Sequence, residues 1–435
     1  MTDNTTKTTA HTTQPYRLRW SWFPSLLFGD GMLPSVLMLA MIMLRRFGMN
    51  NVQTAVLLCL LCLPFILRPL FEKAVAHFVG TTKVWILSAE FIASLSLLAM
   101  AFILPTGYWL QGTACFMPFA VVSGIIHNIA MRRFYLEEPS TANSRQRLFA
   151  MLFHCVAMLF GIGVMTMFAG NLEVLTRNVR YSWSVVFYIM AGINCLLWLW
   201  HSIFLPGGSK PYVAPKDLYG LRKKEYKRVI GRMTHGLGNR MTLLFMLLFI
   251  LPETFVAIVT PLFFIDAPHN GGLGLSPQEF GLSYGTIGIV ALYAGHRMGN
   301  NIISHHSGLH RWFLPMSIAL AINVFALLYM SNNIAASFAT LCLSTFIASM
   351  SLGFGFSAYW ALTEQFAKKE RGMELRRAIA VGILSLTMIA SGIFSVQIQA
   401  DIGYRQFFIL AGFMHIMPIV VACAYMLCKR NNKES

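Results

Sequence analysis

The sequence predicts an all-α integral membrane protein with twelve transmembrane helices arranged in two halves of six. Of its 435 residues, 56% are hydrophobic and 12% are charged, about half the charged share of a soluble protein. The apolar residues fall into about twelve stretches, with one long basic gap after the sixth. A stretch of roughly 20 apolar residues is long enough to cross a bilayer as a helix. Lipid is therefore the expected solvent for most of the chain.

The expected spans lie six before the gap and six after it, with aromatic side chains near many of their ends. Tryptophan and tyrosine favour the interface between lipid headgroups and water, and Trp20, Trp85, Trp109, Trp183 and Trp312 take such positions. The expected spans of the first half are 21–44, 52–71, 84–104, 109–131, 148–169 and 182–205. Those of the second half are 241–265, 283–303, 313–331, 334–361, 374–398 and 404–428.

The basic residues predict the orientation of these spans. With the N-terminus inside, 28 Lys and Arg residues lie on the cytoplasmic side and 5 on the outer side, and Arg68 lies within span two. This bias predicts that both termini are cytoplasmic in a multi-pass protein of the cell's inner membrane. The expected parts are a cytoplasmic N-terminal tail, a six-helix bundle, a basic cytoplasmic linker, a second six-helix bundle and a cytoplasmic tail: 1–20, 21–205, 206–240, 241–428 and 429–435.

The net charge of +17 is spread over short loops between apolar spans. Anionic lipid is therefore the expected counter-charge, and nucleic acid is not an expected partner. Residues 217–233 of the linker predict either a short amphipathic helix on the inner leaflet, bracing the halves, or a solvated basic loop. The first residues show no signal peptide, so the first span itself is expected to direct insertion.

Each half has one carboxyl group near the middle of its first span. Asp30 is close to Pro34, and Glu253 follows Pro252. An ionised group near the bilayer midplane costs at least about 2.5 kcal/mol, so such a group faces a cavity or a partner. As counterparts in the two halves, they are predicted to line a shared central cavity as proton carriers or substrate ligands. The alternative is a pair of protonated acids that hold helices together by hydrogen bonds.

Glu90 lies about two turns into span three from the inner face. Lys73, Lys83 or Arg68 is close enough in the expected topology to pair with it. The sequence therefore predicts a gate or a structural ion pair at Glu90 rather than a substrate contact.

Three further polar residues lie in the inner halves of spans four and five: His127, Asn128 and His154. They are candidates for proton coupling or substrate binding, the alternative being hydrogen-bonded core positions. Arg132 ends span four at the cytoplasmic surface, where it is either a topology anchor or a gating residue.

No enzyme motif is present, and no cofactor or metal is expected. Gly353-Phe-Gly355 does not follow a strand, so it predicts close helix packing and not a phosphate loop. A histidine group on an inside loop, which includes His296 and His305, has no acidic residue close by and makes a weak metal site.

Five short motifs are spread along most of the chain. They are Gly31-Met-Leu-Pro34, Pro69-Leu-Phe-Glu-Lys73 with Phe78-Val-Gly80 and Lys83-Val-Trp85, Glu253-Thr-Phe255, Gly274-Leu-Ser-Pro-Gln-Glu-Phe-Gly281 and Gly353-Phe-Gly-Phe-Ser-Ala358. Together they resemble the major facilitator superfamily, and within it the muropeptide permeases. The resemblance is diffuse, and it implies the major facilitator fold. It also makes Glu72 and Lys73, in the segment after span two, candidates for gating.

The chain departs from the muropeptide permeases in span four, where His127, Asn128 and Arg132 replace a Gln-Asp pair and a second Asp. The predicted function is a secondary transporter that works by alternating access and imports a muropeptide-like or other polar solute together with protons. A siderophore importer, a drug exporter and a non-transporting membrane sensor remain alternatives. The expected partners are a small-molecule substrate, protons and membrane lipids, and the chain is expected to act as a monomer.

Overall fold

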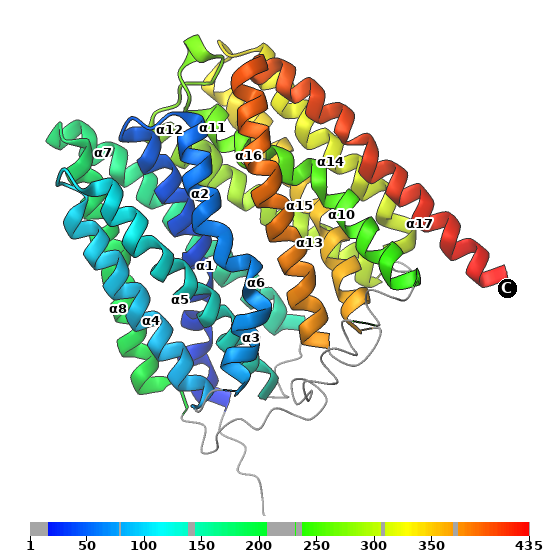
Figure 1. The fold of residues 1–435 in the computed structure, drawn as a ribbon, viewed down its shortest axis with the longest axis horizontal. Coiled ribbons are helices and arrows are strands. Elements are labelled where there is room, and N and C mark those ends of the chain that lie inside the picture. The colour runs from blue at the N-terminus through cyan, green and yellow to red at the C-terminus, as the bar shows by residue number, and fades with distance from the viewer. Residues whose placement is uncertain are drawn as a thin grey trace, which may run out of the picture.

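The computed structural model describes residues 16–77, 80–137, 144–206, 231, 237–305, 309–368 and 373–434, and every regular element in these ranges is helical (Figure 1). Apart from Gly231, the predicted linker helix at 217–233 lies outside the described residues. Helices are expected here, because lipid offers no hydrogen bonds and each helix satisfies its own backbone groups. Most of their side chains are apolar, as suits contact with lipid.

The first half runs from α1 to α8. Its elements are α1 (Tyr16–Arg46), α2 (Asn51–Ile66), α3 (Arg68–His77), α4 (Thr82–Ile103), α5 (Trp109–Glu137), α6 (Ser144–Met158), η2 (Leu159–Met165), α7 (Thr166–Thr176) and α8 (Val179–Phe204). The π-helical turn η2 joins α6 and α7 into one crossing. A bend of 42° separates α2 from α3. Pro69 lies just after this bend and has no backbone N–H to continue the helical ladder.

The second half runs from α10 to α17. Its elements are α10 (Leu237–Ala257), α11 (Val259–Ile265), η3 (Pro268–Asn270), α12 (Pro277–Leu282), η4 (Ser283–Gly288), α13 (Ile289–His305), α14 (Leu309–Asn332), α15 (Phe338–Lys368), α16 (Met373–Met414) and α17 (Ile416–Glu434). A second π-helical turn, η4, joins α12 to α13. α16 breaks at Gly403, whose φ of 78° is left-handed and therefore favours glycine.

Composition alone finds nine membrane-spanning segments in the described residues, and a tenth if the bent pair α2–α3 is one span. The segment Arg376–Leu427 contains the break at Gly403 and therefore supplies two crossings. The run α12–η4–α13, which is richer in glycine and polar residues than the others, supplies the remaining one. The result is twelve crossings in two sets of six, as the sequence predicts.

The two halves meet along two lines of contact. α2 and α3 pack against α16, while η2 and α7 pack against α12 and η4. The second line depends on glycine: a Cβ added to Gly285 would lie 2.7 Å from the Cα of Gly163. Gly353, in contrast, makes its close helix contact inside the second half, where it packs on α13.

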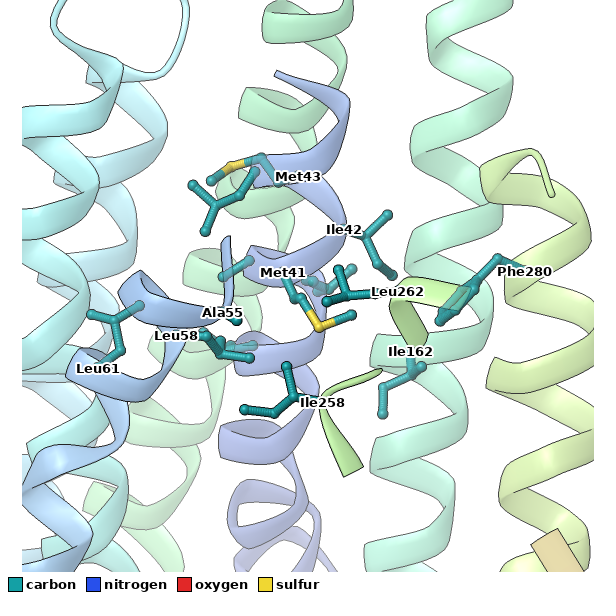
Figure 2. Packing of buried hydrophobic residues seen from close by; sticks show 14 of the residues in the cluster. Met41, Ile42, Met43, Ala55, Leu58, Leu61, Ile162, Ile258, Leu262 and Phe280 are labelled. Atoms are coloured by element: carbon teal, nitrogen blue, oxygen red, sulfur yellow. The ribbon is translucent and has the colours of Figure 1, made fainter. Parts of the chain in front are cut away.

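An apolar cluster closes the interface at the end where α1 finishes and α2 begins, which we call the Arg45 end. Met41 of α1 and Ile162 of η2 come from the first half, and Ile258, Leu262 and Phe280 come from the second (Figure 2). These side chains are buried, so the halves are sealed together by apolar packing near this end.

Candidate functional site

A cavity of about 390 Å³ lies between the two halves. Asp30 of α1 and His154 of α6 line it from the first half. Tyr293 and His296 of α13, with Trp360 of α15, line it from the second. Ionisable, hydrogen-bonding and aromatic groups from both halves therefore converge on one space, the usual arrangement of a small-molecule site.

Asp30 contacts polar residues of two other helices, α5 and α6. Asn128 of α5 donates a hydrogen bond from Nδ2 to Asp30 Oδ1 over 2.5 Å, and Arg68 Nη2 donates to Asn128 Oδ1. His154 Nε2 lies 3.8 Å from Asp30 Oδ2, and its Nδ1 contacts the hydroxyl of Tyr293. A polar chain thus runs from Arg68 through Asp30 into the second half, and it brings the predicted residues Asp30, Asn128 and His154 together.

Glu72, a predicted gating residue, is buried between α3 and α5. Arg68 Nε lies 3.8 Å from one carboxylate oxygen, and Arg133 Nη2 lies 3.7 Å from the other. Arg133 also donates a hydrogen bond of 2.6 Å to the Glu72 carbonyl. Lys73 is exposed and Arg132 is half-buried. These contacts of Glu72 brace two helices of the same half.

Glu90 has partners other than the lysines and arginine expected for it. His127 Nε2 lies 3.1 Å and His201 Nδ1 lies 2.6 Å from Glu90 Oε1, and the carboxylate is 3% exposed. His201 Nε2 in turn meets the Ser25 hydroxyl at 2.8 Å. Lys83, one of the expected partners, instead donates to the carbonyls at the end of α8. The prediction of a basic partner near span two was wrong, because α4 turns Glu90 toward α5 and α8.

Glu253 forms a similar pair inside the second half. His415 Nε2 lies 3.0 Å from Oε1, and Asn323 Nδ2 donates to Oε2 over 3.2 Å. Glu253 lines a separate cavity of about 320 Å³, whereas Asp30 lines the central one. The expectation that the two acids share one cavity was therefore wrong: they occupy neighbouring spaces.

At the Arg45 end, Asp266 gathers donors from both halves. Arg45 Nη2 lies 3.0 Å from Oδ1, Asn51 Nδ2 donates to Oδ2 over 2.7 Å, and the Tyr404 hydroxyl donates to Oδ2 over 3.0 Å. Burial opposes ionisation, but hydrogen bonds from Asn270 and Asn51, the charge of Arg45 and the Tyr404 hydroxyl hold the pKa of Asp266 below its usual range. We call Arg45, Asn51, Asp266 and Tyr404 the Asp266 latch.

Asp266→Asn should open the Arg45 end. A hydrogen bond to a charged group contributes about 1.5–3 kcal/mol, so the ratio of closed to open states should fall at least about tenfold. The distance between spin labels at the exposed positions Tyr108 and Arg405, one in each half, measures the change once the eight native cysteines are replaced. An unchanged distance distribution would show that apolar packing alone closes this end.

The same latch should not respond to pH in the physiological range. A carboxyl with a lowered pKa contributes fully above its unfolded value of about 4, and the contribution is lost only as pH falls through the lowered value. The label distance in the wild-type latch should therefore stay constant between about pH 5 and 8. A transition in that window would assign the pH response to another group at this end.

His296 was expected on an inside loop, yet it lies in α13 and lines the central cavity. Its Nδ1 meets the Ser357 hydroxyl at 3.2 Å, and its Nε2 meets Asn300 at 2.9 Å. Sequence reasoning also missed Tyr293 and Trp360. The available signal was the spacing of Tyr293 and His296, three residues apart and so on one face of a helix.

Neither a protein-family model nor a curated protein matches the sequence. Solved structures match in fold. A bacterial homologue of the human drug peptide transporters aligns with a TM-score of 0.66 at 13% identity, covering 95% of this chain and 98% of that one. The nucleoside transporter NupG aligns with a TM-score of 0.65 at 13% identity, covering 94% and 98%.

The chain has the major facilitator fold. A structure of tetrameric PepTSo2 agrees, with a TM-score of 0.64 at 13% identity over 95% of this chain and 98% of that one. This fold confirms the predicted twelve helices in two halves, and it accounts for a polar cavity at the middle of the interface between them. Sites in such folds lie near the bilayer midplane between the repeats.

Proposed function

We propose that this protein is a secondary transporter that works by alternating access and imports a muropeptide-like or other polar solute together with protons. The observation that carries the proposal is the central cavity, where Asp30 and His154 of one half meet Tyr293 of the other. A carboxyl group in such a place can take up a proton, and His154, which contacts both Asp30 and Tyr293, links that event to the opposite half.

The neighbours in fold support a polar solute. They are a peptide transporter homologue, a nucleoside transporter and proton-dependent oligopeptide transporters. Muropeptides carry a peptide, and the sequence motifs resemble the permeases that import them. Membrane location in the inner membrane, both termini in the cytoplasm and a monomeric state belong to the same proposal, and the excess of basic residues on one side supports the orientation.

With this orientation the Asp266 latch lies at the outer face, and the structure is closed on that side. Import then requires the latch and the apolar cluster around Met41 to separate, while the central cavity closes toward the cytoplasm. The close glycine contact between η2 and η4 adjoins Ile162 of this cluster and serves as the place where the halves pivot. The three parts together give the two alternating states that a transporter needs.

Protonation of Asp30 provides the coupling step. An ionised Asp30 attracts His154 when the imidazole is charged, while a neutral Asp30 does not. Because His154 also contacts Tyr293, release of His154 changes a contact between the halves. Proton uptake or release at Asp30 therefore shifts the balance between the two states of the halves.

Uptake into proteoliposomes tests the function directly. The purified protein, with a pH gradient imposed, should accumulate a muropeptide in preference to ferric siderophores. Empty liposomes and collapse of the gradient by an uncoupler are the controls. Siderophore accumulation instead would favour the siderophore importer, and extrusion of a cationic dye would favour the drug exporter. If none of these compounds is transported, the non-transporting membrane sensor is the remaining alternative.

A further inference from the structure

A second cavity, of about 320 Å³, lies wholly inside the second half. Helices α10, α13, α14, α15 and α16 all contribute to its wall. Leu292 and Phe356 line both this cavity and the central one, so the two spaces adjoin at these side chains. The second cavity is therefore a side chamber of the central site.

The wall of the side chamber is apolar. Val256, Leu327, Leu352 and Met388 supply much of its surface. Its polar residues are largely turned to their own helices: the hydroxyls of Thr254, Thr260 and Thr345 donate to backbone carbonyls three or four residues earlier, over 2.8–2.9 Å. Each of these hydroxyls already donates its one hydrogen, so it has no hydrogen left to donate to a ligand.

The ionisable groups of the chamber are Glu253 and Tyr284. Both carboxylate oxygens of Glu253 already have partners, His415 on one and Asn323 on the other. A cationic ligand would have to displace these bonds, whereas an apolar group would not. The wall of the side chamber is therefore better suited to an apolar group than to a charged one.

We propose that the side chamber receives an apolar part of the transported solute, while the polar end of the same solute binds beside Asp30 in the central cavity. The inference rests on the proposed function and narrows it to an amphipathic solute class: a hydrogen-bonding or cationic head with an apolar extension. The two spaces, about 390 and 320 Å³, lie in the size range of pockets that enclose drug-sized ligands.

The test uses a series of alanyl-alanine n-alkylamides, from ethyl to hexyl, titrated into the protein in nanodiscs by calorimetry. The free amine provides a cation for Asp30, and the alkyl chain probes the chamber. Each methylene buried should tighten binding about fourfold. The acetate salt of hexylamine, which lacks the peptide head, measures simple partitioning into the nanodisc.

Two variants of opposite effect guard against misfolding. Ala257→Phe fills the chamber from a position that does not line the central cavity. It should abolish the dependence on chain length while leaving the dissociation constant of the ethyl compound within about twofold of wild type. Leu352→Ala enlarges the chamber and should extend the gain in affinity to the longest chains. Ala390→Phe adds the same ring at an exposed position of α16 and should behave as wild type.

Equal chain-length dependence in the wild type and Ala257→Phe, or no binding by any member, would overturn the side chamber as part of the site. The fate of the proposed function is read separately, from uptake of the ethyl compound under a pH gradient. Binding that follows chain length without any uptake would support the chamber and contradict the transporter. Uptake without chain-length dependence of binding would support the transporter and contradict the chamber.

Discussion

Asp30→Asn should abolish solute accumulation driven by a pH gradient, while exchange of solute across vesicles at equal pH continues. Asparagine keeps the size of the side chain and can still accept the hydrogen bond from Asn128, so the cavity should keep its shape. It cannot take up a proton, and an imidazolium at His154 loses its anionic partner. The accumulation ratio should therefore fall to about one, since nothing then links proton flow to the alternation of the halves.

Two measurements separate coupling from damage to the fold. Asp401→Asn changes an exposed aspartate at the Arg45 end and should accumulate solute as the wild type does. Exchange by Asp30→Asn at a rate within a few-fold of wild type shows that the binding site is intact. If Asp30→Asn accumulates solute with an unchanged pH dependence, Asp30 is a structural acid and the coupling group lies elsewhere.

The composition of the spans was enough to predict the twelve-helix fold, because a bilayer admits little besides apolar helices. The same composition does not indicate which face of each helix points toward the protein interior. A span surrounded by lipid on one side and by packed helices on the other is apolar all round, so its periodicity is weak. Glu90 shows the consequence. Its depth was predictable, but its orientation toward His127 and His201 was not.

The candidate site was predictable in part for the same reason. Asp30, Asn128 and His154 are polar residues in otherwise apolar spans, which marks them whatever their orientation. Tyr293 and Trp360 are amphipathic and common at membrane interfaces, so nothing in their type assigns them to a cavity. The pairing of Glu253 with His415 joins residues 162 positions apart, a separation that only the packing of α10 against α16 and α17 resolves.

That pair implies one shared proton. His415 Nδ1 lies 2.7 Å from the Ala411 carbonyl, which can only accept, so Nδ1 carries a hydrogen. Nε2 and Glu253 Oε1, 3.0 Å apart, would both be acceptors unless a further proton lies between them. Whether it resides on the imidazole or on the carboxyl group, the pair is electrically neutral in the interior of the second half.

His415→Leu should therefore destabilise the protein strongly, and Glu253→Gln should not. His415 is 0% exposed and Glu253 is 5% exposed, so loss of the histidine leaves a buried carboxyl group without its main partner, at a cost of about 3 kcal/mol or more. Glutamine can donate to Nε2 from its amide and still accept from Asn323, so both bonds of Glu253 survive. The measured quantity is the midpoint of thermal unfolding in detergent, with the exposed His269→Leu as the control.

A double variant, Glu253→Leu with His415→Leu, tests the same point from the other side. Replacing both partners removes the unpaired group, so the double variant should be more stable than His415→Leu alone. If Glu253→Gln instead unfolds as easily as His415→Leu, an amide cannot replace the carboxyl group at this position. A shared proton is then not the basis of the pair. If Glu253→Gln is stable and still accumulates solute under a pH gradient, Glu253 holds helices together, and proton coupling falls to Asp30 alone of the two acids.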